Sequence, residues 1–249
     1  MKLWTAPKLT VLAAPQYTMP TNWPIRWPDG NEATDAEALS EYAGRLCYLS
    51  QRNPAQKTTA EYTETILSHG HGSVLEHASV SILVEGVSRA LTHELIRHRA
   101  GTAVSQVSQR FVDESDADFV IPPLILSNQV ALDEWSTAMS SALVRYQTLV
   151  KTLMKDPGLA DLPATLARKR AREAARGVLP NSTETKLVWT ANLRALRHVI
   201  TLRGDIHADL EIHRFANVLL DTVRPLAPSV FADFTTAPDG SIIPRYPKV

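Results

Sequence analysis

The stretch from Arg97 to Phe111, RHRAGTAVSQVSQRF, restricts the possible folds more than any other part of the sequence. Its three arginines and its histidine cannot enter a packed core without partners, because an unpaired buried charge costs several kcal/mol. Arginine fits a phosphate or a carboxylate at two points. Neutral donors and acceptors stand in the same stretch: Ser105, Gln106, Ser108 and Gln109. We therefore expect this stretch to hold a phosphorylated small molecule.

A structural explanation also exists for the first three residues of this stretch. An isolated RHR triplet is most often a solvated turn or a helix end. A helix is expected from its cap at Ser88 to Gly101, and the helix dipole favours cations near the C-terminus. The dipole does not explain the Ser, Gln and Arg residues that follow, so the ligand-binding interpretation is kept.

The overall charge argues against one large class of function. Lys and Arg together number 26, as do Asp and Glu, so the formal charge is zero. General nucleic-acid binding depends on excess positive charge, which this chain lacks. A local cationic patch on a neutral protein instead suits a small anion. The 249 residues suit one large domain or two small ones, and we expect a single domain over residues 1–249.

Cysteine usage and hydropathy narrow the class further. Cys47 is the only cysteine, which excludes an intramolecular disulfide and a zinc site built from several cysteines. No apolar stretch reaches the roughly 20 residues needed to span a bilayer. The first residues, MKLWTAPKLTVLAAP, lack the core of a signal peptide. We expect a cytoplasmic protein that binds neither membranes nor nucleic acid.

Capping signals and periodicity predict alternating helices and strands. Thr34 and Glu37 form a capping box that opens a helix to about Gln51. Its expected apolar face consists of Ala38, Leu39, Tyr42, Ala43 and Leu46. Thr58 or Thr59 opens a second helix that ends near residues 69–70. Further helices are expected at 128–155, 166–176, 192–204 and 207–224, and strands at 8–14, 80–87 and 184–189.

Two other segments raise competing interpretations. The proline-rich loop 15–30 carries Trp23 and Trp27, which are expected to be packing anchors rather than ligand platforms. Residues 69–77, HGHGSVLEH, hold three histidines and a glutamate and could bind a metal. Their spacing fits no helical two-histidine motif, so no metal site is expected. Gly70 and Gly72 instead favour a turn that lets a ligand approach the backbone.

Four blocks of the sequence together resemble the flavin-dependent thymidylate synthases of the ThyX type. In order they are HGHGSVLEH, then RHR followed closely by SQVSQR, then AREAARGVLPNSTET, then the segment from Asn192 to Arg203 followed by HADLEIHR. The resemblance covers about residues 34–224 and leaves 1–33 and 225–249 as irregular extensions. Two positions depart from the family pattern. Eight residues rather than seven separate Arg99 from Ser108, and Phe111 stands where the family often has Tyr.

The resemblance implies both an architecture and an activity. It implies an α+β fold with a central, mainly antiparallel sheet flanked by helices, assembled as a homotetramer with active sites shared between subunits. It implies a methyltransferase that carries a methylene group from methylenetetrahydrofolate to C5 of dUMP and yields dTMP. FAD, reduced by NADPH, would supply the hydride.

The resemblance also assigns residues by position. FAD contacts fall on Ser73, Glu76, Arg97, His98, Arg99, Gln106, Asn192, Arg194 and His198. Nucleotide contacts fall on Glu94, Arg97, Gln106, Val107, Ser108, Gln109, Arg110, Arg176 and Arg203.

Arg203 matches the catalytic arginine that ionises uracil at N3. A fixed guanidinium stabilises negative charge on the ring electrostatically, and its pKa is too high for an ordinary base. Ser108 lacks a partnered base and is assigned to substrate positioning. Cys47 is expected near the flavin and not as a nucleophile.

Three alternatives stay open at this point. A related methylase acting on UMP is compatible with the extra residue before Ser108 and with the proline–tryptophan loop. A non-catalytic flavin- or nucleotide-binding protein would keep the phosphate-binding arginines but lack the uracil-activating group, so the presence of Arg203 argues against it. A metal-dependent hydrolase would use the histidine cluster.

Overall fold

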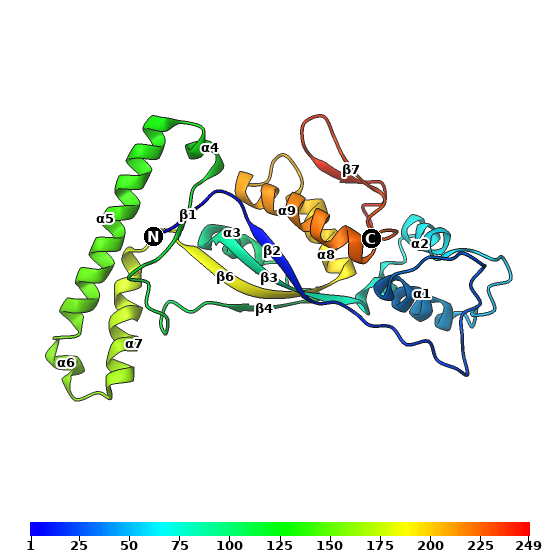
Figure 1. The fold of residues 1–249 in the computed structure, drawn as a ribbon, viewed down its shortest axis with the longest axis horizontal. Coiled ribbons are helices and arrows are strands. Elements are labelled where there is room, and N and C mark those ends of the chain that lie inside the picture. The colour runs from blue at the N-terminus through cyan, green and yellow to red at the C-terminus, as the bar shows by residue number, and fades with distance from the viewer. The chain divides into compact units, whose positions relative to one another are not determined.

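The computed structural model describes residues 1–249, which form two compact units. Unit 1 comprises residues 1–7, 85–95 and 105–187, and unit 2 comprises residues 8–84, 96–104 and 188–249. Figure 1 labels the α-helices and most of the strands of both units. Three strands contain boundaries between the two sets of residues: β3 (Ser79–Ser88), β4 (Thr102–Gln106) and β6 (Glu184–Asn192).

A four-stranded sheet has the order β2–β3–β6–β4, where β2 is Lys8–Ala13. Strands β3 and β6 run in opposite directions. The hydroxyls of Ser81 and Thr190 are 2.8 Å apart, whereas Lys186 Nζ lies 3.4 Å from Glu85 Oε1, so a step forward along β3 meets a step back along β6. The fold thus combines an antiparallel sheet with flanking helices, and the predicted α+β class is confirmed.

Unit 2 contains most of the helices that lie near the candidate site. Its elements besides the sheet strands are α1 (Asp35–Cys47), α2 (Thr59–Ser68), the 3₁₀ turn η1 (Gly72–Glu76), α8 (Leu193–Arg203), α9 (Leu210–Val223), η3 (Arg224–Leu226), β7 (Phe234–Thr236) and β8 (Ile242–Pro244). Helix α9 packs on β2 and on α8. Its fully buried side chains recur at three- and four-residue spacing: Ile212, Phe215, Leu219 and Val223.

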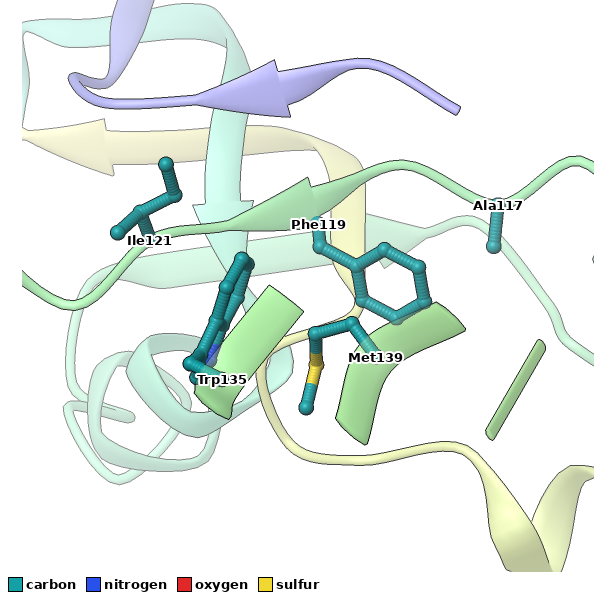
Figure 2. Close-up of a cluster of buried hydrophobic side chains, with 5 residues drawn as sticks. All are labelled: Ala117, Phe119, Ile121, Trp135 and Met139. Atoms are coloured by element: carbon teal, nitrogen blue, oxygen red, sulfur yellow. The ribbon is translucent and has the colours of Figure 1, made fainter. Parts of the chain in front are cut away.

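Unit 1 has its own small core. Its elements besides the sheet strands are β1 (Leu3–Trp4), α3 (Arg89–Leu95), β5 (Phe119–Val120), α4 (Pro123–Leu126), α5 (Gln129–Leu153), α6 (Pro157–Ala160), α7 (Ala164–Ala175) and η2 (Arg176–Val178). Figure 2 shows Phe119 meeting Trp135 and Met139 of α5. The Phe119 and Trp135 rings are perpendicular with centroids 6.5 Å apart, a favourable edge-to-face arrangement.

Helix starts match the sequence predictions better than helix ends do. Both capping boxes are present: Thr34 accepts from the Glu37 amide, and Thr58 accepts from the Glu61 amide. The predicted end of α1 at Gln51 is wrong. The helix stops at Cys47, and Leu49 then adopts a φ of +49°, which no helix can continue through.

Two further boundaries differ from the prediction. Helix α3 ends at Leu95 rather than at Gly101, so the RHR triplet lies in the turn that follows the helix. Helix α9 begins at Leu210 instead of His207, because Asp209 caps it by accepting from the Glu211 amide.

The terminal segments are more regular than expected. Strand β1 pairs in parallel with β5 at Leu3–Phe119 and Trp4–Val120. Strands β7 and β8 form an antiparallel hairpin in the tail that the prolines had indicated to be irregular. None of the helices combines the length and the apolar character that crossing a membrane requires.

Candidate cofactor and nucleotide site

The RHR triplet lies at the surface of unit 2. Arg97, His98 and Arg99 follow α3 and, with Ala195 and His198 of α8 among the other residues, line a hollow of about 370 Å³. Both arginines are exposed and His98 is half-buried. A turn that supplies two guanidinium groups and a helix far along the sequence thus line one hollow.

A hydrogen bond joins His98 to Arg203, the last residue of α8. Arg203 Nε donates to His98 Nε2 over 2.9 Å, which requires an unprotonated Nε2 and places the imidazole proton on Nδ1. Burial, followed by the positive charge of Arg203 and then by His198 and Arg97, lowers the pKa of His98 to about 4. His98 is therefore neutral near pH 7, and its ring meets that of His198 edge-on at 5.5 Å.

A second cavity of about 310 Å³ adjoins this surface. Residues from five parts of unit 2 line it: Glu76, Ala100, Gly101, Asn192, Arg194, Ala195, His198, Pro247, Lys248 and Val249. Arg194 Nη1 and Glu76 Oε1 form an ion pair at 2.6 Å. The Asn192 side chain caps α8 by accepting from the Ala195 amide at 2.8 Å. The Asn192 amide also donates to the Gly101 carbonyl at 3.0 Å, which fixes the turn after the triplet beside the start of α8.

A third cavity, of about 300 Å³, is also lined by Arg194. Ser73, His71 and the exposed thiol-bearing Cys47 line it together with Tyr62. Burial raises the pKa of Tyr62 to about 12. Cys47 thus lies in the same pocket as two residues expected to contact the cofactor, Ser73 and Arg194.

The remaining predicted site residues belong to unit 1: Glu94, Gln106, Val107, Ser108, Gln109, Arg110 and Arg176. Gln106 Nε2 donates to Thr92 and Thr185, and the Ser108 hydroxyl accepts from the Arg110 amide at 3.3 Å. Gln109 is 7% exposed, and its Nε2 has no hydrogen-bond partner.

Two predicted phosphate-binding arginines, Arg110 and Arg176, belong to unit 1. Arg110 forms an ion pair with Glu173 at 2.9 Å, in which both side chains are about 40% exposed. Arg176 is exposed at the end of α7.

Of the sixteen predicted site residues, nine lie in unit 2 and seven in unit 1.

No group of three or more His, Cys, Asp or Glu side chains has an arrangement that could hold a metal ion. The histidines of the HGHG segment have local roles instead. The rings of His69 and His71 lie 5.8 Å apart, and His69 Nδ1 is 2.8 Å from the Thr65 carbonyl.

Comparison with known proteins identifies the family. The family model described as "Thymidylate synthase complementing protein" matches residues 31–229. The flavin-dependent thymidylate synthase of Mycobacterium sp. (strain KMS) is 44% identical over 257 residues, which cover 98% of each chain. The chain belongs to the flavin-dependent thymidylate synthase family.

Other members of the family and one solved structure agree. The flavin-dependent thymidylate synthase of Mycolicibacterium vanbaalenii is 49% identical over 213 residues, covering 83% of this chain and 84% of its own. A UMP/dUMP methylase from Streptomyces cacaoi, solved with 5-Br dUMP, has a TM-score of 0.68 at 21% identity. The alignment covers 93% of this chain and 96% of the methylase chain. The methylase supports the fold, and the curated relatives confirm the resemblance inferred from the four sequence blocks.

The unit 2 cavities suit the cofactor that gives the flavin-dependent thymidylate synthase family its name. A flavin dinucleotide combines a flat ring system with a pyrophosphate. Arg97, Arg99 and Arg194 offer guanidinium forks for phosphate, and His198 offers a ring edge beside them. Gly101 has a φ of +69°, and a Cβ there would lie 2.8 Å from Asn192 Cγ, so a glycine is needed where the turn meets α8.

The sequence prediction missed three residues that line the cavity of about 310 Å³: Pro247, Lys248 and Val249. They lie beyond the region of family resemblance and carry no motif. No sequence signal could have placed them there, because their position depends on contacts with α8 and η1.

Proposed function

We propose that this chain is a flavin-dependent thymidylate synthase that converts dUMP to dTMP by reductive methylation at C5. Methylenetetrahydrofolate would provide the carbon, and NADPH would reduce the flavin. The observation that supports this most directly is the cationic surface of unit 2, where the RHR turn and α8 share one hollow and are joined by the Arg203–His98 bond. The high identity to named synthases over nearly the whole chain supports the same function.

Arg203 has the properties that activation of uracil requires. C5 of the ring becomes nucleophilic when negative charge on N3 and the ring oxygens is stabilised, and a fixed guanidinium does this without accepting a proton. The bond to His98 restrains the Arg203 side chain. Because the pKa of His98 is about 4, His98 is uncharged at neutral pH and does not compete for the developing negative charge.

The other residues would hold the two ligands. Bound FAD would supply the hydride chemistry. Arg97, Arg99 and Arg194 would bind its phosphates, and Asn192 would fix the turn against which it lies. Arg110 would bind the nucleotide phosphate. Its pair with Glu173 is partly exposed and contributes little stability, so a phosphate dianion can replace that carboxylate as its partner.

The visible spectrum and a paired turnover assay test this proposal. We expect purified protein to bind FAD, with bands at about 370 and 450 nm that bleach on addition of NADPH. Assays with dUMP and UMP should show turnover of dUMP with a higher kcat/KM. A higher kcat/KM for UMP would favour the UMP methylase, and flavin binding without turnover of either would favour a non-catalytic protein.

A further inference from the structure

The C-terminal segment Arg245–Val249 lies against the cavity formed by η1 and α8. Pro247, Lys248 and Val249 make up one part of its lining. Figure 1 places the C-terminus beside α8, within the same unit. Neither the sequence blocks nor the family match, which ends at residue 229, assigns any role to these residues.

A buried ion pair holds this segment on α8. Arg197 is fully buried, and its Nη1 lies 2.6 Å from Asp233 Oδ1. Arg197 Nη2 also donates to the Tyr246 carbonyl at 3.2 Å, and the Tyr246 amide donates to Asp233 Oδ2 at 3.1 Å. Arg197 stands between Arg194 and His198 on α8, so one turn of the helix both anchors the segment and supplies two side chains to the cavity.

Two more contacts fix the direction of the segment. The Tyr246 hydroxyl donates to Glu64 of α2, and Arg245 Nη1 lies 3.3 Å from the same carboxylate. Val249 is only 8% exposed and lies against Gly72, where an added Cβ would be 2.9 Å from Val249 Cγ1. The segment is therefore seated at both ends, with Lys248 between Tyr246 and Val249.

The two cationic side chains of the cavity differ: Arg194 has an ion-pair partner, whereas Lys248 has none. Arg194 is paired with Glu76 at 2.6 Å. Lys248 is exposed and has no hydrogen bond or ion pair in the structure. An unpaired ammonium in a ligand-sized cavity is suited to bind an anion.

We propose that Tyr246–Val249 is a binding element of the cofactor cavity, in which Pro247 and Val249 form a wall and Lys248 binds a phosphate of the flavin dinucleotide. The inference rests on the proposed function, since it takes a phosphate-bearing flavin as the ligand. It adds residues to the site that the family motifs do not contain.

Flavin titrations of the full-length apoprotein test the charge of Lys248. Lys248→Glu should weaken FAD binding about tenfold, because it replaces attraction to a phosphate by repulsion. Riboflavin lacks phosphate, so its affinity should not change. Lys155→Glu, at an exposed lysine of unit 1, should bind both flavins as the wild type does. Raising the salt concentration should reduce the difference in FAD affinity between Lys248→Glu and the wild type, because salt screens charge interactions.

Removal of Pro247–Val249 tests the wall. This truncation keeps both Tyr246 anchors and should weaken FAD and riboflavin alike, with the thermal unfolding of the flavin-free protein as a check that it folds. Wild-type affinity for FAD in both Lys248→Glu and the truncation would overturn the inference while leaving the proposed function intact. An equal loss of FAD and riboflavin in Lys248→Glu would overturn the phosphate contact. Failure of the wild type to bind FAD would instead overturn the proposed function.

Discussion

The hydrogen bond between Arg203 and His98 makes the properties of the two side chains depend on each other. Arg203 is restrained because a neutral imidazole accepts its Nε–H, and the imidazole stays neutral partly because the guanidinium is beside it. We therefore expect the role proposed for each side chain to depend on the other, so each can be tested through the other.

Replacing Arg203 by alanine should lower turnover by about two to three orders of magnitude while leaving flavin bound. Loss of one preorganised electrostatic contact to developing charge costs roughly 10²–10³ in kcat. Steady-state kinetics with dUMP and the flavin spectrum of the variant measure the two effects separately. Arg214→Ala, at an exposed arginine of α9, is the matched control and should keep wild-type rates. Near-normal turnover by Arg203→Ala would refute the assigned role.

The titration of His98 gives a second test. Its imidazole NMR signal should move with a midpoint at about pH 4, and in Arg203→Ala that midpoint should rise toward the ordinary value of 6.5 because a neighbouring positive charge is lost. His98→Gln identifies the signal.

The same shift has a consequence for stability. Because the folded-state pKa lies below the unfolded value, the unfolded chain binds more protons between these two pH values. The contribution of His98 to stability is therefore complete above about pH 6.5 and is lost as the pH falls toward 4. A midpoint near 6.5 in the wild type would contradict both expectations.

Two glycines with positive φ separate backbone strain from steric overlap. Gly101 has a φ of +69° and no room for a Cβ beside Asn192, whereas Gly30 has a φ of +74° with no atom within 4 Å. Gly30→Ala should cost about 1 kcal/mol from strain alone. Gly101→Ala should cost more and should also weaken FAD binding, because it displaces the cap of α8. Urea unfolding and flavin titration measure the two quantities, and equal effects at the two positions would contradict the steric argument.

At the scale of elements, a buried polar network joins α1, α2 and the N-terminal loop. Arg45 Nε and Glu41 Oε1 form an ion pair at 2.6 Å with almost no exposure. Glu41 also accepts from Trp27 at 2.9 Å and from Thr59 at 2.7 Å. Trp27 is thus an anchor, as its sequence context indicated, while Trp23 is 45% exposed.

Arg45→Met should destabilise unit 2 strongly. Removing one partner of a buried pair leaves the other charge without compensation and typically costs about 3–5 kcal/mol. The midpoint of urea unfolding should fall accordingly, whereas Arg145→Met on the exposed side of α5 should change it little. A loss below about 1 kcal/mol in Arg45→Met would show that the Trp27 and Thr59 hydrogen bonds suffice to stabilise the Glu41 carboxylate.

Helix α1, which contains part of this network, shows why the helices and strands could be predicted only in part from the sequence. Capping boxes are local, so Thr34 and Thr58 located two helix starts correctly. The buried face of α1 depends on tertiary partners: Leu46, expected inside, is 46% exposed, and Arg45 is buried in its place. Strands of two or three residues, such as β1 and β7, have too little periodicity to be recognised before their partners are known.

At the scale of the whole molecule, the predicted site residues divide between the two units. Motif order predicted the residues of the candidate site, since the four blocks contain all of the predicted residues except Glu94. Their distances could not be predicted, because the His98–Arg203 bond joins positions 105 residues apart. We propose that the site is completed in a homotetramer, in which residues of both units are brought together from different subunits.

Mixing two inactive variants tests this assembly. Arg110→Ala alters unit 1 and Arg203→Ala alters unit 2. If each site combines unit 1 of one subunit with unit 2 of another, an equimolar mixture reassembled from subunits should recover roughly a quarter of wild-type activity. Light scattering should report about 110 kDa, four times the 27.5 kDa chain. A monomer, or a mixture with no recovery, would contradict shared sites.

The pairing of Arg197 with Asp233 has a consequence for the nascent chain on the ribosome. Asp233, which provides the carboxylate, lies 36 positions after Arg197, which provides the guanidinium. At synthesis rates of 5–20 residues per second, roughly 2 to 7 seconds separate the making of the two. During that interval α8 carries a charge it cannot yet bury. We therefore expect α8 to pack fully only after Asp233 has been made, so that the cavity it lines forms late in translation.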